Sequence, residues 1–440
     1  MLSTTQSPFH LSATVGQELK PSPTLFLNER VNQMWAEGKT VYHLGFGESR
    51  FPVHPKIQDA LRANVHQKSY LAGQGLAELR TAVAAFYSRH LQMEIVPGQV
   101  IMGPGSKSLI YAAQMALDAD LFLPTPCWVS YAPQAHLLGK EVHQIPATPA
   151  DQYAFHMDAL DALVQSSSSA NKMLLITSPN NPTGQMYHPA FLEELAAYCR
   201  REGIVVLSDE IYGLIPHEHA EYASMAQYYP EGTIVLTGLS KHLSLGGWRL
   251  GVGIVPGHEQ GQELMKALRV IASEIWSTPT GPVQYAAITA FGDDPDVTAY
   301  IEECTAIHAI RTQYLWRELS ALGISSARPD GGFYMYPNFD NRRTELAARG
   351  VTTSTELAEY LLEHYQLATL PGTAFSTPAH DLSLRLASSY LDMEDDTRAQ
   401  AVLDAYRADP DPVRLMAAHH PNTNEAIRRF GQFVADLGAA

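Results

Sequence analysis

The sequence predicts an α/β protein with a mainly parallel sheet in a large domain and a second, smaller domain. Three apolar runs, residues 172–177, 204–207 and 233–237, have almost no polar face, as expected for strands covered on both sides. Helical stretches alternate with strands from about residue 50 to residue 285, which is typical of a parallel sheet. At 440 residues the chain is too long for one simple core, so we expect two domains.

Composition and charge narrow the classes of function. The net charge of −16 argues against nucleic acid or an anionic membrane surface as a partner, and no apolar run reaches the roughly 18 residues of a membrane span. Residues 1–20 lack the basic and apolar regions of a signal peptide. The cysteines, Cys127, Cys199 and Cys304, show no paired spacing, as expected in a reducing compartment. We therefore expect a cytoplasmic protein.

The N-terminal part of the chain contains the first predicted elements. Residues 1–20 are expected to form a loose arm, and a short strand over 41–44 leads into Gly45-Phe-Gly-Glu-Ser49. Helical spacing of apolar residues predicts three helices, over 25–38, 55–66 and 76–90.

A glycine-rich turn follows the next predicted strand. The strand covers 99–102, the turn is Gly103-Pro-Gly-Ser-Lys-Ser108, and a helix covers 109–117. A strand, a glycine turn and a helix N-terminus form an anion site through backbone N–H groups and the helix dipole. The turn is not a Walker A loop, because Ser106 stands where that pattern needs glycine.

Polar segments follow three of the predicted strands in the middle of the chain. The strand over 172–177 ends at Ser178-Pro-Asn-Asn-Pro-Thr-Gly184, and the strand over 204–207 ends at Asp209. After the strand over 233–237 comes Lys241, with Arg249 eight residues later. This layout suits an amine that forms an imine and a guanidinium that holds a phosphate. A further strand over 121–123 and a helix over 189–202 complete this region.

The C-terminal part is predicted to be mostly helical. The helices are expected over 262–275, 283–322 with an interruption at 292–295, 353–365, 395–407 and about 422–437. Strands are expected within 327–336 and over 383–387, the second carrying Arg385. A lid and an interface patch both fit the additional segment at about 391–420.

Three segments, Ser178–Gly184, Ser208–Tyr212 and Ser240–Gly251, resemble in order and spacing the pyridoxal-phosphate aminotransferases of class I/II. The resemblance runs from about Gly47 to Arg385. It implies the aspartate aminotransferase-like fold, called fold type I, with a seven-stranded-type large domain and a smaller α+β domain. We expect residues 46–288 to form the large domain and 289–440 the small one, to which the arm and start of the chain, 1–45, also contribute.

The resemblance also implies how the cofactor, pyridoxal 5′-phosphate, is held. Lys241 would bond its aldehyde and act as the catalytic base, and Asp209 would keep its ring nitrogen protonated. Tyr212 and Asn181 would contact the phenolic oxygen, and Trp128 would lie on the face of the ring. The phosphate would be bound by Gly105, Ser106, Lys107 and Arg249.

The same resemblance predicts the substrate contacts and the assembly. Arg385 would bind the α-carboxylate as a bidentate pair, beside Gly47, Asn181 and Trp128. In relatives, a tyrosine matching Tyr70 crosses a dimer interface to the partner's phosphate, so we expect a homodimer with shared sites. An aromatic side-chain pocket could be formed by Phe46, Trp128 and Tyr131.

The reaction we predict is transamination between an L-amino acid and a 2-oxo acid. Alternatives on the same framework are a C–S lyase, a cyclopropane-forming synthase, a decarboxylase, an amino-acid oxidase, and a non-catalytic effector-binding domain. The last would add a winged helix-turn-helix, and only about 20 residues precede the first predicted helix. The pair His217 and His219 is expected to lie on the surface, so we predict no metal site.

Overall fold

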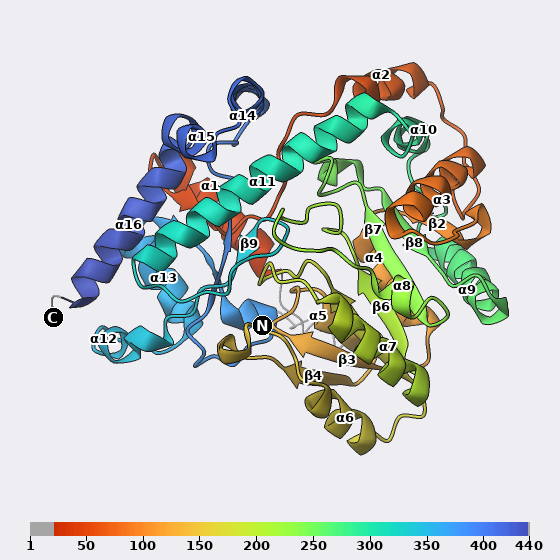
Figure 1. The fold of residues 1–440 in the computed structure, drawn as a ribbon, viewed down its shortest axis with the longest axis horizontal. Coiled ribbons are helices and arrows are strands. Elements are labelled where there is room, and N and C mark those ends of the chain that lie inside the picture. The colour runs from red at the N-terminus through yellow and green to blue at the C-terminus, as the bar shows by residue number, and fades with distance from the viewer. Residues whose placement is uncertain (1–21, 439–440) are drawn as a thin grey trace, which may run out of the picture.

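The computed structural model describes residues 22–438 and is organised around one seven-stranded sheet (Figure 1). The strand order is β2-β8-β7-β6-β5-β3-β4, and only β8 runs antiparallel to its two neighbours. This arrangement confirms the predicted mainly parallel α/β sheet. The strands are β2 Val100–Gly103, β3 Asp120–Thr125, β4 Val142–Pro146, β5 Lys172–Thr177, β6 Val205–Asp209, β7 Thr233–Gly238 and β8 Gly251–Ile254.

The register of the central strands brings their carboxyl ends together. Thr177 at the end of β5 pairs with Asp209 at the end of β6, and Asp209 pairs with Leu236 of β7. Parallel sheets bind ligands at this edge. The polar segments that follow the three strands therefore meet at one place.

Helices cover both faces of the sheet because successive strand residues point in opposite directions. Leu175 of β5 packs in the core that includes α4 and α9, whereas Leu174 packs in the core that includes α6 and α7. The helices of this region are α2 Pro55–Asn64, α3 Ala77–Leu91, α4 Ser106–Ala116, α5 Tyr131–Leu137, α6 Met157–Ser166, α7 Pro189–Glu202, α8 Met225–Tyr228, α9 Glu259–Ile275 and α10 Gly281–Ala290.

One long helix, α11 Pro295–Ala321, runs from beside α2 and α10 to the C-terminal helices (Figure 1). Pro295 occupies the first helical position, and the Asp294 carboxylate accepts from the backbone N–H groups of Asp296 and Val297. Both features favour a helix start at this point. The predicted interruption at 292–295 is therefore the boundary between α10 and α11. The predicted domain boundary at 288/289 falls inside α10 and stays a prediction.

The second region contains two small sheets packed against α11. The antiparallel sheet has the order β11-β12-β9, and β1 pairs with β10 in parallel, so the start of the chain joins this region. The elements are α1 Pro23–Ala36, β1 Tyr42–His43, β9 Tyr334–Met335, α12 Arg343–Ala347, α13 Ser354–Tyr365, β10 Leu367–Ala368, β11 Leu370–Pro371, β12 Leu384–Ala387, α14 Asp396–Ala408, α15 Pro412–His419 and α16 Pro421–Gly438.

Several features of the sequence analysis need correction or completion. The loose arm expected over residues 1–20 lies outside the described residues. The strands β4 and β8 and the helix α6 were not predicted, because β4 is a half-exposed edge strand and β8 begins Gly-Val-Gly. The segment at about 391–420 contains α14 and α15, which pack against α11 and lie beside α16 in Figure 1. Among residues 22–438, no helix has the length and apolar character that crossing a membrane requires.

Candidate active site

A cavity of about 310 Å³ opens at the carboxyl ends of β5, β6 and β7. Most of the residues proposed from the sequence line it, including both lysine and arginine of the segment after β7. The residues that were singled out from the sequence and line the cavity are Phe46, Gly47, Ser106, Lys107, Trp128, Tyr131, Asn181, Asp209, Tyr212, Lys241, Arg249 and Arg385. The lining also includes Thr24, Glu48, Ile211, Ser240, Gly246 and Tyr334, which the sequence did not single out.

Lys241 lies just beyond β7, with its amine directed toward the segment that follows β1. Its Nζ donates to the Gly47 carbonyl oxygen at 2.8 Å. The same ammonium lies 5.4 Å from the centre of the Tyr212 ring and 5.5 Å from that of Phe333. Aromatic faces stabilise a nearby cation. The amine is therefore held at the cavity wall by one hydrogen bond and two rings.

Asp209 is a buried carboxylate at the end of β6, with 3% of its surface exposed. It accepts hydrogen bonds from the Tyr131 hydroxyl at 2.7 Å and from the Ile211 backbone N–H at 3.2 Å. Burial raises the pKa of Asp209 to about 6, although these hydrogen bonds and the Lys241 charge act in the opposite direction. A cation bound next to Asp209 would offset the cost of burying its charge.

Tyr131 therefore has a contact that its sequence pattern did not indicate. The sequence analysis placed Tyr131 in an aromatic wall, but its hydroxyl orients the Asp209 carboxylate. Its ring also meets Trp128 edge-on, with the ring centres 5.2 Å apart.

Arg385 enters the cavity from β12 as a buried cation. Its guanidinium donates to the Asn181 side-chain oxygen at 3.2 Å and to the Gly45 carbonyl at 2.5 Å, and it lies 4.7 Å from the Tyr334 ring centre. Burial lowers the pKa of Arg385. Within residues 22–438 it forms no ion pair, and its buried Nε has no hydrogen-bond partner. Such a cation is suited to bind a ligand carboxylate.

The turn before α4 approaches Arg249 very closely. Gly105 has a φ of +87°, and a Cβ at this position would overlap the Arg249 guanidinium. A Cβ on Gly251 would likewise overlap the Ser106 backbone nitrogen. The two glycines therefore let Arg249 meet the N-terminus of α4, where the first backbone N–H groups of a helix have no partner within the helix and can bind an anion. This cradle fits the phosphate of pyridoxal phosphate, the cofactor that the resemblance implies.

Two tyrosines connect the cavity wall to Gly47. The Tyr212 and Tyr334 hydroxyls are 3.0 Å apart, and the Tyr334 hydroxyl donates to the Gly47 carbonyl at 3.2 Å. Burial raises the pKa of Tyr212 well above its usual value. A Cβ on Gly47 would overlap the Tyr334 hydroxyl, so glycine is required there. Tyr334 lies in the strand that was expected within residues 327–336, but no role was predicted for it.

Tyr70 does not line this cavity. It lies between α2 and α3 with 88% of its surface exposed. Its predicted contact with a cofactor phosphate in another subunit therefore stays a prediction.

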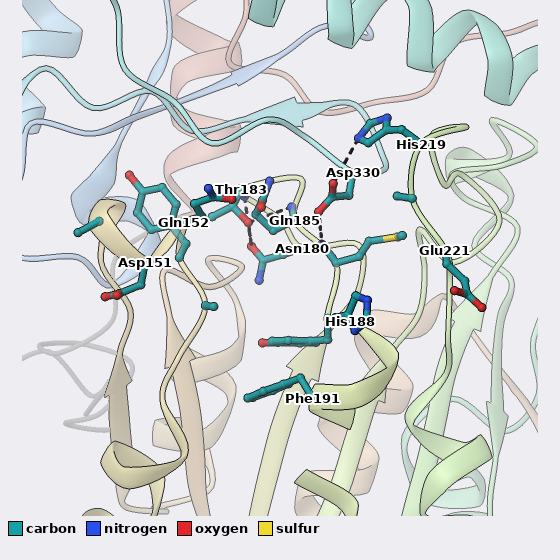
Figure 2. A pocket seen from close by; sticks show the side chains of 16 residues that line it. Asp151, Gln152, Asn180, Thr183, Gln185, His188, Phe191, His219, Glu221 and Asp330 are labelled. Carbon is teal, nitrogen blue, oxygen red and sulfur yellow. Dashed lines mark hydrogen bonds and ion pairs between the residues drawn. The ribbon is translucent and has the colours of Figure 1, made fainter. Parts of the chain in front are cut away.

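A larger cavity, about 780 Å³, lies beside the loops that follow β4, β5 and β6 (Figure 2). His219 and Asp330 form an ion pair on one side of it, 3.3 Å apart, and Asp151 and Gln152 lie on the other. His217 was expected on the surface, but it is buried. Its two ring nitrogens lie 3.1 Å from the Pro329 and Gly332 carbonyl oxygens, and these contacts satisfy the polar atoms of the buried ring.

The absence of a metal site stays a prediction. One group of possible ligands among residues 22–438, formed by Asp120, Glu141 and His143, lies at the amino ends of β3 and β4. This is the edge of the sheet opposite the cavity around Lys241, and the His143 and Asp120 side chains are already paired at 3.6 Å.

Comparisons with known proteins agree with one another. The sequence model of the family described as "Aminotransferase class I and II" matches residues 39–403. The chain is 32% identical to the aspartate aminotransferase of Bacillus sp. (strain YM-2), covering 82% of this chain and 91% of the relative. It is 29% identical to a probable aspartate/prephenate aminotransferase of Aquifex aeolicus, covering 82% of this chain and 90% of the relative. The structure of Thermus thermophilus aspartate aminotransferase with maleate matches with a TM-score of 0.78 and 26% identity, covering 91% of this chain and 99% of that one.

Proposed function

Because this chain belongs to the class I and II aminotransferases, which transfer an amino group between an amino acid and an oxo acid, we propose that it does so with pyridoxal 5′-phosphate held in the cavity around Lys241. The observation that carries this proposal is the meeting of three groups in one cavity: Lys241, buried Asp209, and Arg385, which forms no ion pair within residues 22–438. Bound pyridoxal phosphate supplies an electron-accepting ring that stabilises negative charge at the substrate α-carbon.

Lys241 has two roles in this proposal. Its amine would hold the cofactor by the aldehyde, and the same amine would serve as the base for the substrate α-proton. The Gly47 carbonyl, 2.8 Å from Nζ, keeps the amine at the cavity wall. Tyr212 and Asn181 donate to the phenolic oxygen.

The two ends of the cofactor meet opposite charges. Asp209 would face the ring nitrogen and keep it protonated, and that positive charge would offset the cost of burying the carboxylate. The backbone N–H groups of Ser106 and Lys107 and the Arg249 guanidinium would bind the phosphate. The Gly105 N–H, also expected to donate, is already bonded to the Gly103 carbonyl oxygen at 2.8 Å. Trp128 packs on the face of the ring.

Arg385 binds the substrate α-carboxylate, with the Gly47 backbone nearby. Its buried guanidinium has donors that no carboxylate of residues 22–438 satisfies. Because Asn181 shares a hydrogen bond with Arg385, the substrate site and the contact to the phenolic oxygen are adjacent.

We further propose that the amino donor is an acidic amino acid. Several relatives are named aspartate aminotransferases, and one similar structure holds maleate, which has two carboxylates. A second carboxylate needs a second cation. The cationic side chains lining the cavity are Lys107, Lys241, Arg249 and Arg385. The Lys107 ammonium, 4.9 Å from the Trp128 ring centre, is the one left without another role.

The test is to reduce the purified protein with borohydride and map the modified peptide by mass spectrometry. The cofactor should be attached to Lys241, and the untreated protein should convert aspartate and 2-oxoglutarate to oxaloacetate and glutamate. Attachment at another lysine contradicts the site. Cofactor on Lys241 with a product other than an oxo acid would favour one of the alternative reactions.

We also propose a homodimer with shared sites, in the cytoplasm. Tyr70 is 88% exposed, as required of a side chain that reaches into another subunit, and the three cysteines are free thiols. Mixing Tyr70→Phe subunits with Lys241→Ala subunits should restore activity, because hybrid dimers contain one site free of both changes. A monomer with full activity would contradict shared sites.

A further inference from the structure

A chain of three polar side chains, two of them buried, lies near Lys241 and joins segments that are far apart in the sequence. His308 of α11 lies with Nε2 2.9 Å from the Ser49 hydroxyl, and Ser49 lies 2.6 Å from the Ser244 hydroxyl. Ser244 also accepts a hydrogen bond from the Phe51 backbone N–H at 3.1 Å. We call His308, Ser49 and Ser244 the His308 chain.

The His308 chain acts on the turn that carries Lys241. The Ser244 backbone N–H donates to the Lys241 carbonyl at 3.3 Å and closes this turn. Ser244 has a φ of +58°, a left-handed conformation that is unfavourable for a serine. Its hydroxyl contacts with Ser49 and Phe51 hold it there, so the turn depends on the segment after β1.

The same two segments meet a second time at the lysine itself. The Lys241 Nζ donates to the Gly47 carbonyl, two residues before Ser49. The turn from Lys241 to Ser244 is therefore tied to the segment Gly47–Phe51 at both of its ends. A displacement of Ser49 would shift the place at which the amine meets Gly47.

His308 is the member of the chain that connects these contacts to the helix spanning both regions. Burial lowers the pKa of His308 well below its usual value, and the charges of Arg311 and Lys241 act in the same direction, so the ring is neutral. Its Nδ1 is buried and has no hydrogen-bond partner within residues 22–438. Ser49 is thus the polar contact of this ring in the described chain, and the ring packs edge-on against Phe51 at 5.0 Å.

We propose that His308 is a positioning residue for Lys241: through Ser49 and Ser244 it holds the left-handed turn and thereby the place of the Lys241 amine. This proposal rests on the proposed function only in that the proposed function makes the Lys241 amine important. The hydrogen bonds of the His308 chain are present in the protein without cofactor, so the positioning role can be tested without turnover.

The experiment measures acylation of Lys241 in the cofactor-free protein at a fixed pH, by limited acetic anhydride and quantitative peptide mass spectrometry. His308→Phe keeps an aromatic ring and removes both nitrogens, whereas the amide of His308→Gln can still reach Ser49. His420→Phe is the matched control, because His420 is also buried and bonded, to the Leu415 carbonyl at 3.1 Å in the C-terminal helices. Exposed Lys266 serves as the internal reference.

We expect Lys241 in His308→Phe to be acylated at least about threefold faster, relative to Lys266, because the amine leaves Gly47 more often. His308→Gln and His420→Phe should match the wild type. In the loaded enzyme, His308→Phe should lower kcat about five- to tenfold and leave KM within about twofold, because Arg385 is untouched.

Ser49→Ala removes the same connection without a change in α11 and should raise the acylation of Lys241 by a similar factor. Ser49→Ala also tests the proposal if His308→Phe does not fold. The double variant should be no more reactive than the stronger single one, since both changes break one chain. Wild-type acylation in folded His308→Phe or in Ser49→Ala would overturn the proposal, as would equal acceleration in His420→Phe. A wild-type protein with no transamination but with the expected acylation pattern would contradict only the proposed function.

Discussion

The cavity around Lys241 and the cavity in Figure 2 differ in more than size. The cavity around Lys241 has less than half the volume of the one in Figure 2, about 310 Å³ against about 780 Å³. The smaller cavity contains two buried charged groups, Asp209 and Arg385, and each forms a hydrogen bond with a side chain of another segment. The charged groups of the larger cavity are at least partly exposed to solvent. Asp151 contacts Thr148 and His156, which are close in the sequence, and Asp330 pairs with His219 of another loop. A site for chemistry is recognised by charges that the fold keeps out of water.

One carboxylate from each cavity makes the contrast specific. Burial raises the pKa of Asp209 to about 6, whereas hydrogen bonds from Thr148 and His156 lower the pKa of Asp151. Asp151 is already satisfied by the chain and by water. Asp209 bears a cost that only a bound cation can offset, which is what a protonated ring nitrogen would supply.

The largest expected effect is on turnover in Asp209→Asn. The amide keeps the shape and can still accept from Tyr131, but it removes the charge that keeps the ring nitrogen protonated. We expect kcat to fall at least about a hundredfold, equivalent to about 2.7 kcal/mol of barrier. Steady-state kinetics of protein with bound cofactor measures this. Near-normal turnover would contradict the role of Asp209.

The same substitution should stabilise the cofactor-free protein at neutral pH. Because folding raises the pKa of Asp209 from 3.8 to about 6, the native state binds the extra proton within this window. The wild type therefore loses stability as pH rises from about 4 to about 6, by about 3 kcal/mol, and Asp209→Asn does not. Urea unfolding of both apoproteins at pH 4 and pH 7.5 measures the difference. If the unfolding free energies of the wild type and Asp209→Asn differ by the same amount at pH 4 and pH 7.5, Asp209 is not desolvated.

The sequence predicted the strand-end part of the site well, for a physical reason. Strands buried on both faces are visible as apolar runs, and their carboxyl ends must meet at one edge. Asp209, Asn181 and Lys241 each follow such a run, and all three line the cavity. Periodicity also predicted α7 and β5 with their observed bounds.

The contacts between these segments could not be predicted in the same way. Tyr131 reaches Asp209 and Tyr334 reaches Gly47 across the fold, and neither distance has a local signal in the sequence. The His308 chain likewise depends on how α11 brings His308 next to Ser49, 259 residues away in the sequence. Half-exposed β4 was not predicted because an edge strand needs no continuous apolar run.

An intermediate effect is expected for Lys107→Ala. If Lys107 pairs with the distal carboxylate, the KM for aspartate should rise about tenfold, as for one lost charge-assisted hydrogen bond, with little change for alanine. The ratio of kcat/KM for aspartate to that for alanine measures this selectivity. Equal losses with both amino acids would assign Lys107 to the cofactor instead.

The smallest effects should come from the larger cavity. Asp151→Asn and Glu221→Gln make the same chemical change as Asp209→Asn, a carboxylate to an amide, at places where water reaches the side chain. We expect kcat/KM for aspartate to stay within about twofold of the wild type, and unfolding free energies to change by at most about 0.5 kcal/mol. Water screens the interactions of an exposed carboxylate, so the loss of its charge has little effect on neighbouring groups. A tenfold loss of kcat/KM in Glu221→Gln, with cofactor bound and stability retained, would show that the larger cavity contributes to the reaction. The distinction between buried and solvated carboxylates would then fail as a guide to the site.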